Sequence, residues 1–257
     1  MHKVKCIVSY EGTDFHGFAR QPRQRTVQGE IERVLSEVFD CPIETVTASR
    51  TDAGVHARMQ VIHFSLPHER IAVDNLPYIC SRQLPVDVQI QSASLVDAGF
   101  DARRSVLWKT YRYSIMTGLI PDVFWRRYAI HEPRPLHVDA MRSAAEHLLG
   151  EHDFSSFCTA RAQQISKVRT VHRIHFIYDD VSQCLQIEIT GNGFLHNMIR
   201  IMVGTLLNVG RGKWQSTEVQ QILRGRDRKL AGPTAPAHGL CLWHIEYPGI
   251  DHLLDDA

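Results

Sequence analysis

The segment "ASRTDAGVHAR", residues 48–58, gathers groups that could do chemistry around one carboxylate, that of Asp52. Arg50 lies two residues before Asp52 and His56 four residues after it, and groups of this kind would favour the ionised carboxylate. An Asp-x-Gly sequence is also typical of a tight turn, in which the Asp side chain accepts backbone N–H groups and Gly54 has a positive φ. The loop alone therefore leaves two interpretations open, a structural turn or a catalytic carboxylate.

Three polar or aromatic residues alternate in "WKTYRYSI", residues 108–115. Lys109, Tyr111 and Tyr113 would share one face of a strand, because successive side chains of a strand point to opposite faces. This pattern is typical of a half-buried strand in which the lysine stem packs on the sheet and its amine reaches water.

An arginine interrupts the apolar segment 191–210, "GNGFLHNMIRIMVGTLLNVG". Arg200 needs a partner there, because an unpaired buried charge is costly, and any nearby carboxylate would serve. His196, Arg200 and Gly204 are spaced to line up along one side of a helix.

The apolar periodicity predicts six elements in each half of the chain, with one extra helix in the second half. Helix 27–39 is the best supported, because its apolar residues recur at helical spacing behind Thr26, a plausible N-cap. The first half is predicted to contain strands 3–10, 43–48, 58–66 and 86–96 and helices 27–39 and 72–82. The second half is predicted to contain strands 106–116, 170–178, 183–190 and 239–247 and helices 136–149, 193–209 and 215–224.

The repeated order β-α-β-β-α-β predicts an α+β fold of two ferredoxin-like split β-α-β units, whose antiparallel sheets join around a central cleft. The first unit, residues 1–102, would carry the Asp52 loop. The second unit, residues 103–250, would complete the cleft, and residues 251–257 would form a C-terminal tail.

Composition limits the possible classes of function. The 257 residues suit two domains, and the six cysteines form no C-x-x-C pair, which indicates reduced thiols and a cytoplasmic location. The first ten residues alternate polar and apolar side chains, so neither an export signal nor a membrane anchor is expected. A net charge of +1 does not indicate nucleic acid by itself. Local basic clusters that could follow a phosphate backbone are Arg20, Arg23 and Arg25; Arg103 and Arg104; Arg211 and Lys213; and Arg224, Arg226, Arg228 and Lys229.

No cofactor and no metal are expected. The 15 histidines include no H-E-x-x-H motif. The segment "GNGFLH" departs from G-x-G-x-x-G, because His196 stands where the last glycine would be.

Several segments together resemble one enzyme family. "SRTDAGVHA" is similar to the signature of tRNA pseudouridine synthase A, and "YEGTDFHGFARQPRQRTVQGEIERVL", "WKTYRYSI" and "GNGFLHNMIRIMVGTLLNVG" resemble further segments of that family in the same order. The resemblance covers nearly the whole chain. One departure is Phe18-Ala19, where the family usually has Trp and Gln, which questions local RNA contacts but not the chemistry.

The resemblance implies an isomerase that converts uridine to pseudouridine in the anticodon stem-loop of tRNA, at positions 38 to 40, without cofactor. It implies that Asp52 is the catalytic residue, that Tyr111 stacks on the target uracil, and that Arg200 faces Asp52 across the cleft. Arg50 matches the position that helps to extrude the target base. A homodimer that shares one tRNA is also implied, whereas no membrane partner is expected.

Two rival functions stay open. Paired split β-α-β units also build RNA-reading sheets, so a non-catalytic RNA-binding protein is the main alternative. A hydrolase that uses Asp52 as nucleophile would want a second carboxylate or a metal site, and the sequence presents neither beside the loop.

Overall fold

The computed structural model describes residues 2–159 and 166–249, so the predicted C-terminal tail, 251–257, lies outside the described residues. Its strands are β1 (Lys3–Tyr10), β2 (Val46–Thr47), β3 (His56–Ser65), β4 (Val88–Val96), β5 (Trp108–Met116), β6 (Ile130–His131), β7 (Gly150–Asp153), β8 (Val168–Asp179), β9 (Cys184–Gly191) and β10 (Leu240–Glu246). Its α-helices are α1 (Val27–Phe39), α2 (Leu76–Ser81), α3 (Val138–Glu146), α4 (Met198–Gly210) and α5 (Glu218–Gly225). Short 3₁₀ turns include Val73–Asn75 before α2 and Ala237–Gly239 before β10.

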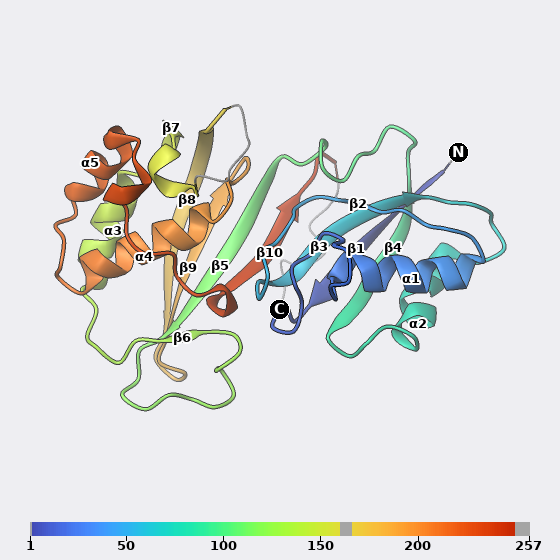
Figure 1. The fold of residues 1–257 in the computed structure, drawn as a ribbon, viewed down its shortest axis with the longest axis horizontal. Helices are drawn as coiled ribbons and strands as arrows, with labels where there is room; N and C mark the ends of the chain where they lie inside the picture. Colours follow the sequence, from blue (N-terminus) through green and yellow to red (C-terminus); the bar gives the residue numbers. More distant parts are fainter. Residues whose placement is uncertain (1, 160–165, 250–257) are drawn as a thin grey trace.

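All ten strands belong to one sheet, in the order β4-β1-β3-β10-β5-β9-β8-β7 with β2 beside β3 and β6 beside β5 (Figure 1). In each half the first strand of the split unit pairs on one edge with the fourth strand and on its other edge with the third. This is the strand order of a ferredoxin-like unit. The predicted α+β class with mostly antiparallel pairing is confirmed. The division into units at residues 102 and 103 stays a prediction.

The two halves meet where β10 pairs with β3 in parallel, through Cys241 opposite His56 and Leu242 opposite Ala57. On its other edge β10 pairs antiparallel with β5. The last strand of the second half therefore joins both halves into one continuous sheet, instead of leaving two sheets that only touch.

Helix α1 begins and ends as its sequence predicts. The Thr26 side chain accepts a hydrogen bond from the N–H of Gly29, and Val27, Ile31 and Leu35 are buried on one face. The helix ends because Asp40 adopts a left-handed conformation with φ 52°.

The predicted strand 43–48 is shorter than expected, because its first residues bind helix α1 instead of a strand. The N–H and hydroxyl of Thr45 donate to the Glu32 carboxylate, and the N–H of Ile43 donates to the Ser36 hydroxyl. Strand β2 is limited to Val46 and Thr47, which pair with His63 and Ile62 of β3.

Two predicted helices also differ. The segment 72–82 forms a 3₁₀ turn followed by the short helix α2. The predicted helix 193–209 begins only at Met198, because Asn197 has a φ of 61° that interrupts helical geometry. Residues 193–197 are therefore loop, so His196 is not on the helix face with Arg200.

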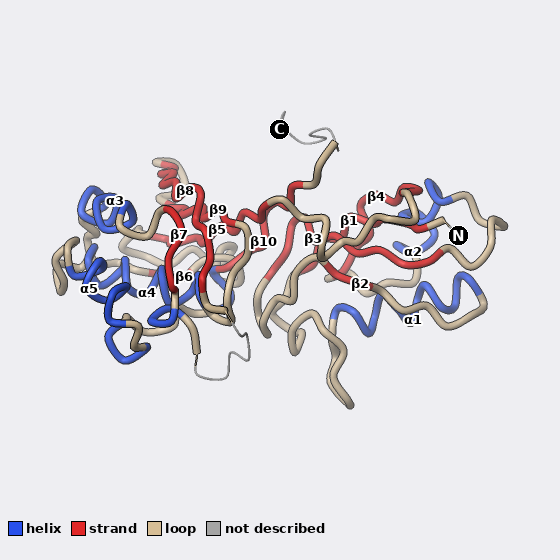
Figure 2. The backbone as a smooth tube through the Cα atoms, turned by 90° about the horizontal axis from the view of Figure 1, so that it is seen from above, coloured by secondary structure: helices blue, strands red, loops and turns tan. Residues whose placement is uncertain are grey.

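One face of the sheet carries the buried residues of both halves, including Tyr10, Ala57, Leu242 and Tyr111, which are neighbours in register. Helices α1 and α4 lie on the same side of the sheet in Figure 2. No helix in the two described ranges has both the length and the apolar character that crossing a bilayer requires.

Candidate active site

Asp52 lies in the loop between β2 and β3, in a turn that its backbone closes. The N–H of Val55 donates to the carbonyl of Asp52 at 3.1 Å, and Gly54 supplies the positive φ of 77°. The predicted turn is therefore present, but the backbone carbonyl of Asp52 closes it instead of the side chain. The Asp52 carboxylate is left for other partners.

Hydrogen bonds from β1 and β3 hold this loop in place. The hydroxyls of Tyr10 and Thr51 lie 2.7 Å apart, and the Gln60 side chain donates to the carbonyl of Ser49 at 2.7 Å. Gly12 brings a second loop against the turn, because a Cβ at that position would lie 2.0 Å from the carbonyl oxygen of Val55. These contacts fix the backbone on either side of Asp52.

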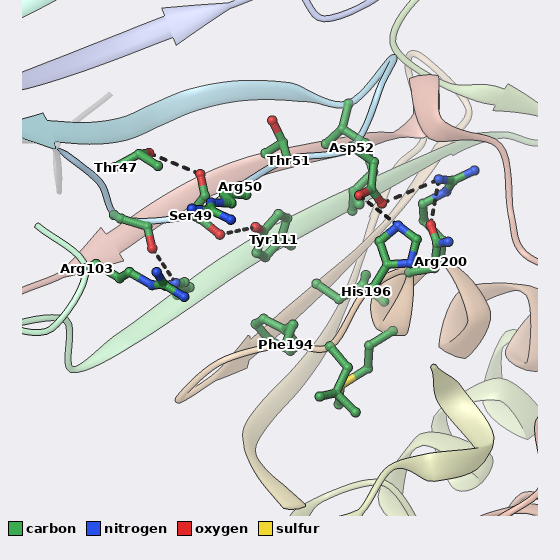
Figure 3. Close-up of a pocket in the computed structure, with 18 of the residues that line it drawn as sticks. Thr47, Ser49, Arg50, Thr51, Asp52, Arg103, Tyr111, Phe194, His196 and Arg200 are labelled. Atoms are coloured by element: carbon green, nitrogen blue, oxygen red, sulfur yellow. Dashed lines mark hydrogen bonds and ion pairs between the residues drawn. The ribbon is translucent and has the colours of Figure 1, made fainter. Parts of the chain in front are cut away.

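Two side chains from the second half reach the Asp52 carboxylate (Figure 3). Arg200 Nη1 lies 3.7 Å from Oδ2, and His196 Nε2 lies 3.4 Å from Oδ1. The Arg200 guanidinium is anchored elsewhere, because its Nε donates to the carbonyl of Ala235 at 2.7 Å and its Nη1 to Asn197 Oδ1 at 2.8 Å.

The close approach of Ala235 to α4 depends on Gly204. A Cβ on Gly204 would lie 1.8 Å from the carbonyl oxygen of Pro233, so only glycine lets that segment pack against the helix. Gly204 thus acts on the site through the backbone that holds Arg200.

The carboxylate opens into a cavity of about 590 Å³, a volume typical of small-ligand sites. Tyr111 lines it, and the Tyr111 ring meets Phe194 edge to face with 5.5 Å between centroids. The Tyr111 hydroxyl is 2.8 Å from the Ser49 hydroxyl, and burial raises the pKa of Tyr111 to about 12. The tyrosine therefore presents a neutral hydroxyl and a fixed ring beside the cavity.

The half-buried Lys109 also lines this cavity. Its Nζ donates to the carbonyl of Ala48 at 2.7 Å. Burial, together with the charges of Arg103 and Arg169, lowers the pKa of Lys109 to about 8.

All four residues predicted for the site line this one cavity: Asp52, Tyr111, Arg50 and Arg200. Arg50 is exposed, whereas Tyr113 is fully buried with its hydroxyl donating to the carbonyl of Pro236. His56, in contrast, does not line the cavity. Its ring accepts a hydrogen bond from the N–H of Gly12 and faces the carbonyl of His238 instead of Asp52. The expectation that His56 flanks the carboxylate is wrong, because β3 begins at this residue and buries its ring.

The structure places three of the residues discussed for RNA contacts: Phe18, Arg25 and Arg211. Phe18 is fully buried and packs against Tyr10, so a change at this position alters the core and not a direct RNA contact. Arg25 is held by two hydrogen bonds to Asp87, and Arg211 by the buried Glu132, so these two arginines already have intramolecular partners.

Sequence reasoning missed His196, Phe194 and Lys109 as site residues. His196 and Phe194 lie in a loop where the periodicity predicts the start of a helix. For Lys109 the alternation with Tyr111 already placed both side chains on one face, so the signal was present.

Among the described residues that line the cavity, Asp52 is the only carboxylate. Across residues 2–159 and 166–249, no group of three or more His, Cys, Asp or Glu is arranged to hold a metal ion. The described lining thus sets a single carboxylate beside a guanidinium, an imidazole and two aromatic rings.

Comparison with known proteins identifies the family of this chain. A sequence model of the family described as tRNA pseudouridine synthase matches residues 6–103 and 144–248. The tRNA pseudouridine synthase A of Brevibacillus brevis is 47% identical over 247 residues, covering 96% of this chain and 100% of that protein. That of Bacillus subtilis is 45% identical over 247 residues, covering 95% of this chain and 99% of the relative. The chain belongs to the tRNA pseudouridine synthase family.

Solved structures show only distant similarity. A Cbf5-Nop10-Gar1 complex matches with a TM-score of 0.35 and 10% identity, covering 79% of this chain and 54% of that chain. A similarity this low adds nothing to the family assignment.

Proposed function

We propose that the protein is an isomerase that converts uridine to pseudouridine in the anticodon stem-loop of tRNA, with Asp52 as the catalytic residue. Family membership supports isomerase activity on tRNA uridines and argues against the non-catalytic RNA-binding alternative. The observation that carries the proposal is the lone carboxylate of Asp52 in the cavity, with Arg200 and His196 on its two oxygens.

The reaction matches this set of groups. The N1–C1' bond of uridine must break, the base must turn while it is held, and C5 must bond to C1', with no redox step and no phosphate energy. One carboxylate suffices, either by attack at C6 of the ring or at C1' of the sugar. A hydrolase would want a second carboxylate, and the described lining holds only Asp52.

Tyr111 is proposed to stack on the target uracil, since an aromatic face can hold a base in either orientation. The Ser49 contact and the Phe194 edge fix the ring before substrate arrives. Arg50 is proposed to brace the nucleotide stack from which the base is taken, and its exposed position in the cavity lining suits that role.

The substrate is proposed to be the anticodon arm with its uridines at positions 38 to 40, modified in the cytoplasm. A homodimer is also proposed. It is supported by the loop between β5 and β6, which exposes large apolar side chains: Leu119, Ile120, Val123 and Phe124 are 69–85% exposed. Apolar surface of this kind is usually covered by a partner. Light scattering on the parent and on Phe124→Asp would test whether this loop joins two copies.

One assay tests the activity directly. The purified protein would be incubated with tRNA that carries tritium at uracil C5, with excess chelator and no added nucleotide. Formation of the C5–C1' bond displaces the C5 hydrogen, so tritium should appear in water. If a pool of all tRNAs releases no tritium, the isomerase assignment is wrong.

A further inference from the structure

The loop between β9 and α4 places His196 against the nucleophile and also against a hydroxyl. His196 Nε2 lies 3.4 Å from Asp52 Oδ1, and the other ring nitrogen, Nδ1, lies 2.5 Å from Thr159 Oγ1. The imidazole thus connects a hydroxyl of the segment after the 3₁₀ turn Ser155–Phe157 to the carboxylate of the other half of the molecule.

The two neighbours of the imidazole, Asp52 and Thr159, determine which of its ring nitrogens is protonated. An ionised carboxylate only accepts hydrogen bonds, so the ring nitrogen that faces it is best protonated. In the neutral ring, Nδ1 is then the acceptor and the Thr159 hydroxyl donates to it. In the charged ring, Nδ1 donates and the same hydroxyl accepts. Thr159 can therefore satisfy Nδ1 in both charge states while Nε2–H stays directed at Asp52.

Arg200 alone leaves the carboxylate free to rotate about one contact. The guanidinium is anchored by Ala235 and Asn197, and its contact with the carboxylate is to Oδ2, at 3.7 Å. A second donor at Oδ1 fixes the plane of the carboxylate, because two contacts on different oxygens remove that rotation. Both distances exceed ordinary hydrogen-bond length, and catalytic hydrogen bonds often tighten when substrate binds.

We propose that His196 is a positioning residue that, with its ring held by Thr159, sets the orientation of Asp52 toward the reacting nucleotide. This inference rests on the proposed function. It assigns to His196 no contact with RNA and no transfer of a proton. His196 is 44% exposed, so replacing it should not unfold the protein.

Three variants test the role by rescue. His196→Phe fills similar space without a donor, and it should lower kcat about tenfold or more while KM and tRNA affinity stay within about twofold of the parent. His196→Gln places an amide N–H near the position of Nε2 and should recover most of that loss. Thr159→Val keeps the shape of the threonine but loses its hydroxyl, and its kcat should fall between those of the two His196 variants.

The matched control is His147→Phe, since His147 follows α3 and does not line the cavity. It should keep the kcat of the parent. An unchanged kcat in His196→Phe overturns the inference, as does an equal loss in the Phe and Gln variants or a loss confined to KM. A parent that releases no tritium overturns the proposed function, whereas an active parent with an unaffected His196→Phe overturns the inference alone.

Discussion

The side-chain oxygens of Tyr10 and Thr51 lie 2.7 Å apart, in a buried hydrogen bond between the first strand of the sheet and the residue before Asp52. Burial is the main reason that the pKa of Tyr10 is raised, so its hydroxyl stays protonated. The position of the Asp52 loop is therefore set in part by this contact with β1.

Tyr10→Phe removes this hydroxyl and leaves the Thr51 oxygen without its partner. The free energy of unfolding should fall by about 1 kcal/mol or more, and kcat should fall several-fold as the loop loosens. Urea unfolding and tritium release would measure both. Tyr78→Phe is the control, because Tyr78 is 67% exposed and should change little. Equal behaviour of the two variants would contradict the role of this bond.

Asp52→Asn should keep the fold and tRNA binding but lose pseudouridine formation by several orders of magnitude. Asn has nearly the same size and loses the charge and nucleophilicity, while affinity depends mainly on phosphate contacts elsewhere. A gel-shift titration and a tritium time course on one preparation would measure both. Asp139→Asn, at a side chain that is 97% exposed, is the control. A variant that kept about a tenth or more of the parent rate would make Asp52 a turn residue only.

Arg200→Lys should lose nearly as much activity as Arg200→Met. The guanidinium uses Nε for Ala235 and Nη1 for Asn197 while it approaches Asp52, and one ammonium cannot reproduce this planar set of donors. The loss should appear in kcat, measured under saturating tRNA. Recovery of the parent kcat by lysine would mean that a positive charge alone suffices at this position.

Gly12→Ala should destabilise the protein by more than about 2 kcal/mol, because the new Cβ would lie 2.0 Å from the backbone oxygen of Val55. Gly99→Ala is the matched control, since a Cβ there would meet no atom within 4 Å. Thermal unfolding of both would separate the clash from any general effect of losing a glycine. Similar melting temperatures would mean that the two loops are not packed as described.

Lys109→Met should change how stability depends on pH. Burial lowers the pKa of Lys109 to about 8, whereas the pKa of a lysine in the unfolded chain is about 10.4. Between these values the unfolded chain binds more protons, so the contribution of Lys109 to the free energy of unfolding rises with pH. The penalty is complete below pH 8, where it amounts to at most about 3 kcal/mol.

The measurement is urea unfolding of parent and variant at pH 7, 9 and 10.5. The advantage of Lys109→Met over the parent should be greatest at pH 7 and should shrink as the pH rises. A difference that stays constant across this range would show that the amine is not desolvated in the folded protein.

The sequence was most informative where local pattern and tertiary structure agree. Helix α1 follows from Thr26 and the apolar period after it, both of which act locally. Strand β2 is shorter than predicted because Glu32 and Ser36 of that helix bind the backbone of Thr45 and Ile43. Such a contact depends on packing and cannot be read from alternation alone.

The candidate site likewise combines residues that the sequence predicts with residues whose placement depends on the fold. Residue types and the family resemblance singled out Asp52, Tyr111, Arg50 and Arg200, and the structure brings them to one cavity, although their roles stay predictions. The sequence predicts His196 on a helix, whereas the structure has it in a loop. Its approach to Asp52 follows from the left-handed Asn197, which redirects the chain before α4. Asparagine tolerates that conformation, but nothing in the periodicity required it there.

The pairing of β10 with β3 has a consequence for how the protein is made. A ribosome delivers the Asp52 loop before Leu240–Glu246, because the loop precedes that strand in the chain, and domains emerging first tend to fold first. The first half can therefore assemble while the strand that joins it to β5 is still untranslated. Because that strand connects β3 to β5, we expect Asp52 to meet Arg200 only after it has emerged, so a nascent chain should hold the Asp52 carboxylate without its guanidinium partner.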